Sequence, residues 1–401
     1  MKALLISQYY NPEKGFITAD VAELLAASGI DTVVLTTFPS FPQGKFYDSV
    51  KSIWPSKAKE NNVNVWRIPH YPSHNLSKVK RFFSYISFCF GSLFFVPFVA
   101  RRPKIVIVYQ TPFTSAIPSL WHKWVSKSKL VYIVADLWPE SFSASGLLQQ
   151  NSTIINLMYK YSRWINSQAD LIICSTKGTA QRYNDDGISN KKLAYIPVWT
   201  QCPENIDNYQ SSNTTSAKTI IYAGNIGPAQ SLNLVIDAAA LLKQKNMDVK
   251  FHIYGIGPDL ERHKKRVEEL KLDNVIFFGR VDPQEVISAS MKADAQLVHL
   301  AKSPLFEMTI PSKLFFSLSL GKPMFCGLSG ESKAIAEDSG SAIMIEQENG
   351  EDFANKIIEF IDLPTSKINE MGNAGREYYL KNFDKEILLA KYKEQIFELL
   401  Q

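Results

Sequence analysis

The stretch KALLISQYYNPEKGFITADVAELLAASGIDTVVLTTF, residues 2–38, decides the fold class. Its apolar runs at 2–7 and 32–38 have the length of strands, and they enclose residues 16–29, where apolar side chains recur at helical spacing up to Gly29. Two strands joined by one helix form a βαβ unit, in which the strands run parallel. The stretch therefore predicts an α/β protein built on a parallel sheet.

The same alternation continues in two series. Further strands are expected at 63–69, 104–110, 129–136, 170–175 and 193–197, and then at 218–225, 248–255, 274–279, 295–300 and 323–327. Residues 200–217 are polar and rich in Ser, Thr and Asn, which is typical of a linker, and residues 364–401 look helical throughout. We predict two doubly wound, Rossmann-like domains facing a cleft, at 1–200 and 201–380, with 381–401 as a C-terminal helix that could pack back on the first domain.

Composition and charge narrow the class of partner. With 401 residues, 45% hydrophobic and 21% charged, the chain is globular and long enough for two domains. The first 200 residues carry 22 Lys or Arg against 11 Asp or Glu, whereas the rest carry 22 against 28. A basic first half indicates an anionic partner, and nucleic acid ranks last because no nucleic-acid module is present.

The four cysteines form no CxxC pair, so reduced cytosolic thiols are preferred over a metal or disulfide framework. The apolar run at the N-terminus is too short for a signal peptide.

Two loops that follow strands have the composition of anion sites. In NPEKGF, Gly15 stands just before a helix, where backbone N–H groups can meet a phosphate or form an ordinary turn. In YAGNIGPAQSL, residues 222–232, Gly224 and Asn225 occupy the matching place in the second domain. The loop lacks the third glycine of a dinucleotide fingerprint and the Lys-Ser/Thr of a P-loop, which disfavours a dehydrogenase and a nucleoside triphosphatase.

The segment FEMTIPSKLFFSLSLGKPMF, residues 306–325, places a cation at the start of a helix. Pro311 suits the first turn, and Ser312 can cap the helix or present its N–H. Lys313 in the first turn opposes the helix dipole unless an anion binds both. The alternative is a solvated lysine. A diphosphate held by Lys313 and by free N–H groups is the preferred interpretation.

A third segment, VADLWPES at residues 134–141, carries two carboxylates. Asp136 is at the end of a strand and Glu140 lies one helical turn further on, so they could serve as acid, base or ligands of substrate hydroxyls. Equally, Asp136 could only cap a helix begun by Pro139. Trp138 could stack on a sugar ring or belong to the core.

Residues 78–104 combine aromatic and basic side chains without an acid. The run 82–100 has no charge, and basic residues flank it, among them Lys80, Arg81, Arg101 and Arg102. Its length could span a bilayer, but a span would split one sheet across the membrane. A buried domain helix and a helix lying in the membrane interface both remain open. The number of cations and phenylalanines favours contact with an anionic membrane surface.

The combination of two α/β domains with GNIG, DLWPES and PSKLFFSLSLGKP resembles the retaining GT-B glycosyltransferases of family 4 over nearly the whole chain. More narrowly, it is similar to bacterial enzymes of O-antigen, capsule and colanic acid synthesis, including N-acetyl-L-fucosamine transferases. The resemblance implies that a nucleotide-sugar donor is bound by residues of several loops. These residues are Gly15, Gly224, Asn225, Gly279, Arg280, Pro311, Ser312 and Lys313. Gly279 and Arg280 would border the nucleotide base, and the others would lie near the diphosphate.

The chain departs from the family after the first strand of the second domain, where GNIGPAQSL lacks the Arg and Lys that relatives often have, and again before Gly-Lys-Pro. Many relatives carry two glutamates eight residues apart before Gly-Lys-Pro, where this chain has Met308 and Phe316. Glu307, one residue away, is the candidate for the first glutamate, which would grip the donor sugar. The second, which would hold the ribose, has no candidate.

What the resemblance implies for the reaction is transfer from a UDP-N-acetyl-sugar, with UDP-N-acetyl-L-fucosamine as one donor to consider, to a polyprenyl-diphosphate-linked saccharide. Lys313, Asp136 and Glu140 would be the catalytic residues, without a metal or another cofactor. The enzyme would be peripheral on the cytoplasmic face of the inner membrane. Two alternatives stay open: a UDP-sugar 2-epimerase of the same architecture, and a non-catalytic subunit that binds a sugar nucleotide.

Overall fold

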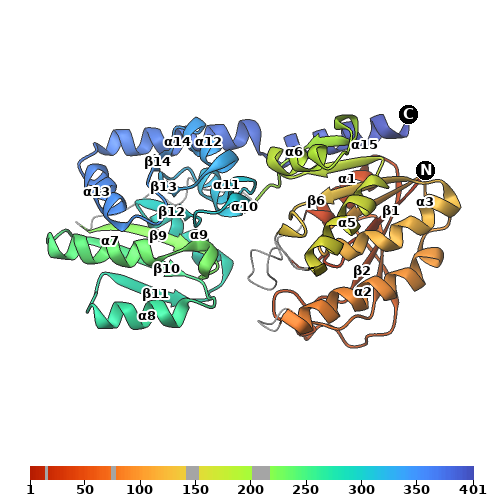
Figure 1. Cartoon of the computed structure of the whole chain (residues 1–401), viewed down its shortest axis with the longest axis horizontal. Helices are drawn as coiled ribbons and strands as arrows, with labels where there is room; N and C mark the ends of the chain where they lie inside the picture. Colours follow the sequence, from red (N-terminus) through yellow and green to blue (C-terminus); the bar gives the residue numbers. More distant parts are fainter. Residues whose placement is uncertain (14–16, 74–77, 141–152, 201–216) are drawn as a thin grey trace. The chain divides into compact units, whose positions relative to one another are not determined.

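The structure is a computed structural model that describes every residue except 14–16, 74–77, 141–152 and 201–216. The chain divides into two compact units (Figure 1). Unit 1 comprises Met1–Val198 together with Glu386–Gln401, and unit 2 comprises Trp199–Lys385. The C-terminal helix therefore belongs to unit 1, although the chain reaches it only after unit 2.

Unit 1 is built on an eight-stranded sheet with the order β3-β4-β2-β1-β5-β6-β7-β8. All neighbours pair in parallel except β3 and β4, which are antiparallel. The strands are β1 (Lys2–Ile6), β2 (Asp31–Thr37), β3 (Ser56–Glu60), β4 (Val63–Ile68), β5 (Ile105–Tyr109), β6 (Lys129–Val134), β7 (Leu171–Cys174) and β8 (Leu193–Tyr195).

Helices cover this sheet on its two faces. The described helices of unit 1 are α1 (Thr18–Ala27), α2 (Lys78–Val99), α3 (Leu120–Ser126), α5 (Thr153–Ser167), α6 (Lys177–Asp185) and α15 (Lys385–Leu400), with short 3₁₀ helices η1 (Phe113–Ser119) and η2 (Asn190–Lys192). Every residue of β5 is buried, as expected for a central parallel strand covered on both sides. This burial explains why the central strands read as continuous apolar runs.

Unit 2 repeats the architecture on a six-stranded sheet with the order β11-β10-β9-β12-β13-β14, all parallel. The strands are β9 (Lys218–Ala223), β10 (Val249–Tyr254), β11 (Val275–Gly279), β12 (Ala295–His299), β13 (Met324–Gly327) and β14 (Ala342–Met344). The helices are α7 (Asn233–Gln244), α8 (Leu260–Glu269), α9 (Pro283–Lys292), α10 (Pro304–Glu307), α11 (Ser312–Ser319), α12 (Gly330–Asp338), α13 (Gly350–Ile361) and α14 (Thr365–Asn382), with η4 at Pro228–Gln230.

The predicted fold class, two Rossmann-like domains with parallel sheets, is confirmed. Two strands were not predicted. Strand β3, SKAKE, is a mostly exposed edge strand without an apolar pattern, and β14 has three residues. Residues 364–401, expected to be helical throughout, form two helices, because α14 ends at Asn382 and α15 begins at Lys385. The buried ring of Phe383 occupies the break and packs on Phe315.

Candidate functional site

A cavity of about 400 Å³ opens at the carboxyl ends of β9, β10 and β11 in unit 2. This is the edge at which ligands bind in open α/β sheets. Two cations, Arg280 and Lys313, are among its lining residues, and none of these residues is a carboxylate. The lining comprises Thr200, Ala223, Gly224, Tyr254, Gly255, Gly279, Arg280, Val281, Pro283, Val286, Ile287, Ser312, Lys313 and Phe316. The cavity is therefore suited to an anionic ligand.

Lys313 lies in the first turn of α11, as predicted, and reaches the glycine loop after β9. Pro311 is the N-cap residue. Its side chain cannot accept a hydrogen bond, so no N-cap side chain satisfies the first backbone N–H groups of the helix. The ammonium lies 5.0 Å from the ring centroid of Tyr222, and no ion pair joins it to a carboxylate in the described part of the chain. Loss of hydration lowers the pKa of Lys313 to about 8, although the side chain keeps one side on the cavity.

The backbone of the glycine loop lies directly against the end of the Lys313 side chain. Gly224 has φ +147°, and a Cβ built on it would overlap with Cε of Lys313. A Cβ on Gly255, in the loop after β10, would in turn overlap with the backbone of Gly224. Two glycine loops and the lysine thus form one tightly packed wall of the cavity.

Replacing Gly224 by alanine should displace Lys313 from this wall. The added methyl group cannot coexist with Cε of Lys313, and φ +147° is strained for any residue with a Cβ. We expect the variant to fold, with a lower melting temperature. With UDP, the nucleotide that the family resemblance implies, as the probe, calorimetry should give binding at least tenfold weaker than in the natural protein. A variant that binds UDP like the natural protein would show that the contact between Gly224 and Lys313 does not shape the ligand site.

The other residues of unit 2 that were predicted to bind the donor lie partly at the cavity and partly outside it. Gly279, at φ +71°, and the exposed Arg280 line the cavity. Asn225 is exposed next to the lining, and its side-chain amide donates a hydrogen bond to Gln230. Glu307 is exposed on α10 and is not a lining residue, whereas Phe316 is. The wall that the second family glutamate would occupy is thus aromatic here.

Three candidate residues of unit 1 follow strand β6 in the sequence: Asp136, Trp138 and Glu140. Asp136 follows this strand, is exposed, and accepts a hydrogen bond of 3.2 Å from Thr111, which follows β5. Glu140 forms an ion pair of 3.2 Å with Arg182. The indole of Trp138 stacks on Phe113 with centroids 5.4 Å apart. Asp136 is thus free of a cationic partner in the described residues, while Glu140 and Trp138 are engaged in packing and pairing. Gly15 lies outside the described residues.

Glu13 was not predicted to have a role. Its buried carboxylate accepts hydrogen bonds from the backbone N–H groups of Ser40 and Phe41, each at 2.7 Å, and of Tyr10 at 3.2 Å. Burial raises its pKa, and these hydrogen bonds oppose the rise. Glu13 thereby links the residues that follow β1 to those that follow β2. Its partners 27 and 28 residues away are not visible in the sequence.

Helix α2 exposes phenylalanines on one face and buries two serines on the other. The side chains at 84, 88, 92 and 96 form one buried stripe, which consists of two serines, a phenylalanine and a valine; the amide of Gln8 donates to Ser84. The opposite stripe, exposed by between 66% and 71%, consists of Phe90, Phe94 and Phe98. A helix that only completed a core would not expose three phenylalanines on one stripe.

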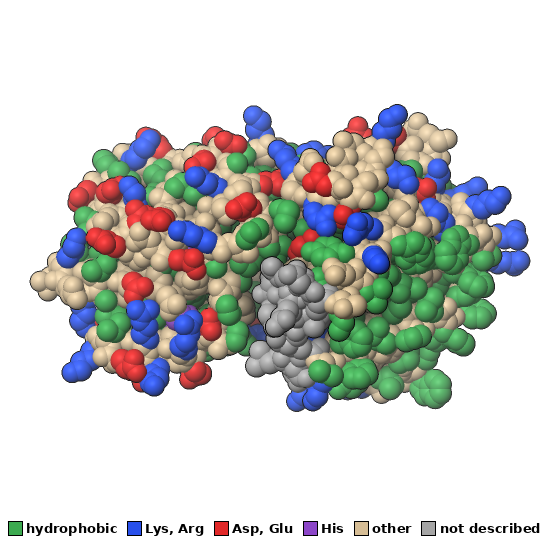
Figure 2. Space-filling model, in the orientation of Figure 1, with side chains coloured by type: hydrophobic (Ala, Val, Ile, Leu, Met, Phe, Trp, Pro, Cys, Tyr) green, Lys and Arg blue, Asp and Glu red, His purple; other side chains and the backbone are tan. Residues whose placement is uncertain are grey.

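Helix α3 extends this aromatic face. It packs on α2, where the ring of His122 contacts the carbonyl of Val96, and it exposes Trp121, Trp124 and Val125. Figure 2 shows hydrophobic side chains gathered over α2 and α3 with lysines and arginines at their margins. The sequence has no Asp or Glu from residue 61 to residue 135. Lys80, Arg101 and Arg102 are exposed, and Arg81 is half-buried. Among the described residues, α2 is also the one helix long and apolar enough to cross a membrane, but a third of it is buried in unit 1.

Comparison with known proteins assigns both units. Residues 15–199 match the model of the glycosyl transferase 4-like domain, and residues 205–378 match that of glycosyl transferases group 1. WcaI, a glycosyl transferase of Escherichia coli assigned to colanic acid biosynthesis, is 26% identical over 99% of this chain and 100% of its own. Sucrose-phosphate synthase of Thermosynechococcus elongatus has the same fold, with TM-score 0.74, 15% identity and coverage of 99% and 98%. The HepE protein of Anabaena, solved with UDP and glucose, superposes with TM-score 0.68, 12% identity and coverage of 99% and 100%. The chain is a GT-B glycosyltransferase of the group 1 family.

Proposed function

We propose that the protein transfers a sugar, with retention of configuration, from a UDP-linked donor to a lipid-diphosphate-linked saccharide in surface polysaccharide synthesis. The observation that carries the proposal is the cavity of unit 2, whose lining has two cations and no carboxylate. The donor is a UDP-N-acetyl-sugar, with UDP-N-acetyl-L-fucosamine as the first to try. The colanic acid assignment of WcaI and the UDP in HepE support the choice of pathway and nucleotide.

The chemistry required is the departure of UDP from the anomeric carbon. As this C–O bond breaks, negative charge grows on the diphosphate, and Lys313 with the N-terminus of α11 would stabilise it without a metal ion. The acceptor hydroxyl would bond to the anomeric carbon on the face that UDP leaves, and its proton would leave with UDP. Asp136 would orient this hydroxyl or stabilise the positively charged sugar, because it has no cationic partner among the described residues.

The low pKa of Lys313 predicts how donor binding depends on pH. In the free protein its pKa is about 8, and a bound diphosphate would raise it because the opposite charge favours the ammonium. We therefore expect the Kd for UDP to be constant near pH 7 and to rise above pH 8 by up to tenfold per pH unit. Calorimetry should also detect proton uptake on binding above pH 8. In Lys313→Arg the Kd should not change over this range; a constant Kd in the natural protein would exclude contact between Lys313 and the diphosphate.

The acceptor side would lie against the membrane. Three observations support a face that enters the headgroup region of an anionic bilayer: the exposed phenylalanines of α2, the exposed tryptophans of α3 and the acid-free stretch 61–135. A lipid-linked acceptor is confined to that surface. The enzyme would accordingly be peripheral on the cytoplasmic face of the inner membrane, with α2 lying in the interface rather than across it.

A thermal-shift screen with UDP-, GDP- and TDP-sugars, repeated with EDTA, tests the donor class. A ligand that binds the native state stabilises it by mass action, so UDP-sugars should raise the melting temperature and EDTA should not cancel the shift. A shift with GDP- or TDP-sugars alone, or one that EDTA abolishes, would contradict the proposal. Formation of an epimer from UDP-N-acetylglucosamine without acceptor would favour the epimerase.

A further inference from the structure

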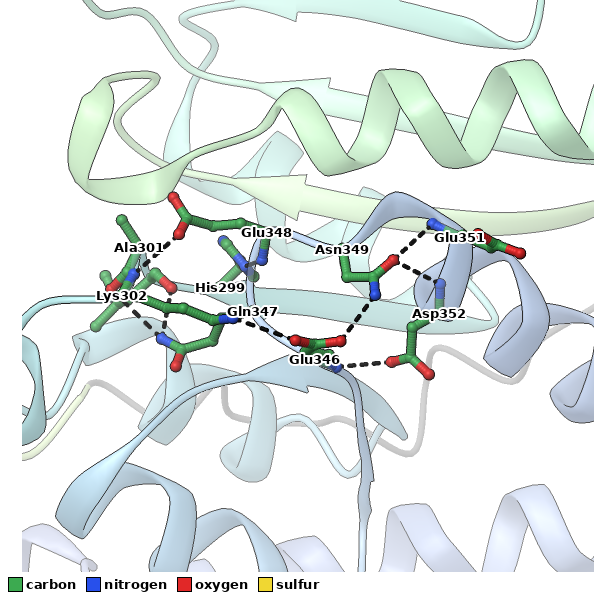
Figure 3. A network of polar contacts seen from close by, with 10 residues as sticks. His299, Ala301, Lys302, Glu346, Gln347, Glu348, Asn349, Glu351 and Asp352 are labelled. Carbon is green, nitrogen blue, oxygen red and sulfur yellow. Dashed lines mark hydrogen bonds and ion pairs between the residues drawn. The ribbon is translucent and has the colours of Figure 1, made fainter.

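A buried histidine joins three loops at the carboxyl edge of the sheet in unit 2. His299, the last residue of β12, is 2% exposed. The backbone N–H of Glu348 donates to its Nε2 at 3.0 Å, and its Nδ1 lies 2.8 Å from the carbonyl oxygen of Gln230 (Figure 3 shows His299 with Glu348). An amide N–H can only donate, so Nε2 must be the acceptor, and the proton is on Nδ1. His299 is therefore a neutral ring with both nitrogens used.

The two residues beside this ring have strained backbones. Ser231 has φ +45° and Glu348 has φ +64°, in the left-handed region that residues other than glycine seldom adopt. The hydroxyl of Ser231 donates to the carboxylate of Glu348 at 3.0 Å, and the N–H of Lys302 reaches the same carboxylate at 3.4 Å. Such strain persists only where the surroundings enforce it, and it is concentrated at functional sites.

From His299 a chain of contacts leads to the cavity. His299 contacts the backbone carbonyl of Gln230. The side-chain oxygen of Gln230 in turn accepts a hydrogen bond of 2.9 Å from the side-chain amide of Asn225. The carbonyl of Asn225 accepts one of 2.5 Å from the hydroxyl of Tyr222. Asn225 follows Gly224 directly, and the ring of Tyr222 lies under the ammonium of Lys313. The conformation of the glycine loop therefore depends on the position of the Gln230 carbonyl.

The ring also lies close to the neighbouring strand. A Cβ built on Gly327 of β13 would overlap with Cδ2 of His299, so this position has room for the ring only because it is a glycine.

We infer that His299 is a positioning residue for donor binding: by donating from Nδ1 to Gln230, it sets the glycine loop that borders the donor diphosphate. Glu348 contributes by donating its N–H to Nε2 of the ring, and Ser231, next to Gln230, donates its hydroxyl to the carboxylate of Glu348. The inference rests on the proposed function of the cavity, because it assigns the network to that ligand.

Two variants of His299 separate its two hydrogen bonds. In His299→Asn the amide can replace Nδ1 and still donate to Gln230, whereas in His299→Gln it can replace Nε2 and accept from Glu348 but no longer reaches Gln230. Calorimetry with UDP should give a Kd within about threefold of the natural value for His299→Asn and one roughly tenfold higher for His299→Gln, because only His299→Gln loses the hydrogen bond to Gln230 that positions the glycine loop. Equal affinities in the two variants would overturn the inference.

Melting temperatures distinguish positioning from a structural role. Asn349→Ala is the matched control, because Asn349 caps α13 in the same polar network (Figure 3) through the N–H groups of Glu351 and Asp352, away from the glycine loop. It should lower the melting temperature and leave the Kd for UDP unchanged. If affinity falls with melting temperature in all three variants, the role of His299 is structural and the inference fails. If the natural protein does not bind UDP at all, the proposed function fails first.

Discussion

Replacing Lys313 by alanine is expected to lower turnover at least a hundredfold and to weaken UDP binding at least tenfold. The lysine is the cation that contacts the glycine loop, and it stands where the helix dipole of α11 already favours an anion. Charge on the leaving diphosphate grows during the reaction, so the effect on turnover should exceed the effect on binding; removing one donor to such a charge typically costs a factor of about 10² to 10³.

Lys322 provides the matched control. It follows α11, is half-buried and has a pKa lowered by burial, but it does not line the cavity. Lys322→Ala should therefore reproduce the loss of a desolvated lysine without the loss of activity. Steady-state rates of UDP release and calorimetry with UDP measure both effects. Natural values of both in Lys313→Ala would exclude the diphosphate role.

Replacing Lys80, Arg81, Arg101 and Arg102 together by glutamine should release the protein from anionic vesicles. Each cation near an anionic surface contributes about 1 kcal/mol, so four should change the partition coefficient by roughly 10³. Co-sedimentation with vesicles of phosphatidylglycerol and phosphatidylethanolamine measures the change. Activity on a soluble acceptor analogue should persist, because none of the four lines the cavity.

The charge-matched control for this experiment lies in unit 2. Lys264, Lys265, Lys333 and Lys356 pair only with carboxylates of their own helices at the surface, so their replacement by glutamine changes net charge equally. This control should sediment with vesicles like the natural protein. If both variants sediment equally with vesicles, these four basic residues do not mediate binding to an anionic membrane.

The sequence predicts the central sheets well because their strands are buried on both faces. IVIVY in β5 and VVLTT in β2 are apolar runs of strand length between turn signals. Strand β3 could not be predicted in this way, since SKAKE forms a strand only by pairing with β4 at an exposed edge. At the break between α14 and α15, Phe383 packs on Phe315, 68 residues earlier, and this contact is not visible in the local sequence.

The candidate site was predictable where a residue type conflicts with its local setting. Lys313 opposes a helix dipole, and this conflict is visible in the sequence. The role of His299 was not, because its partners Gln230 and Glu348 are 69 and 49 residues away and only the fold brings them together. The pairing of Glu140 with Arg182, 42 residues apart, was hidden for the same reason.

One transfer reaction tests the proposed function most directly. The enzyme is incubated on vesicles with a polyprenyl-diphosphate-linked saccharide and the UDP-sugar selected by thermal shift, with EDTA present, and the anomeric proton of the product is followed by NMR. We predict release of UDP and a product with the anomeric configuration of the donor. A product of inverted configuration, or no transfer from any UDP-sugar that binds, would contradict it.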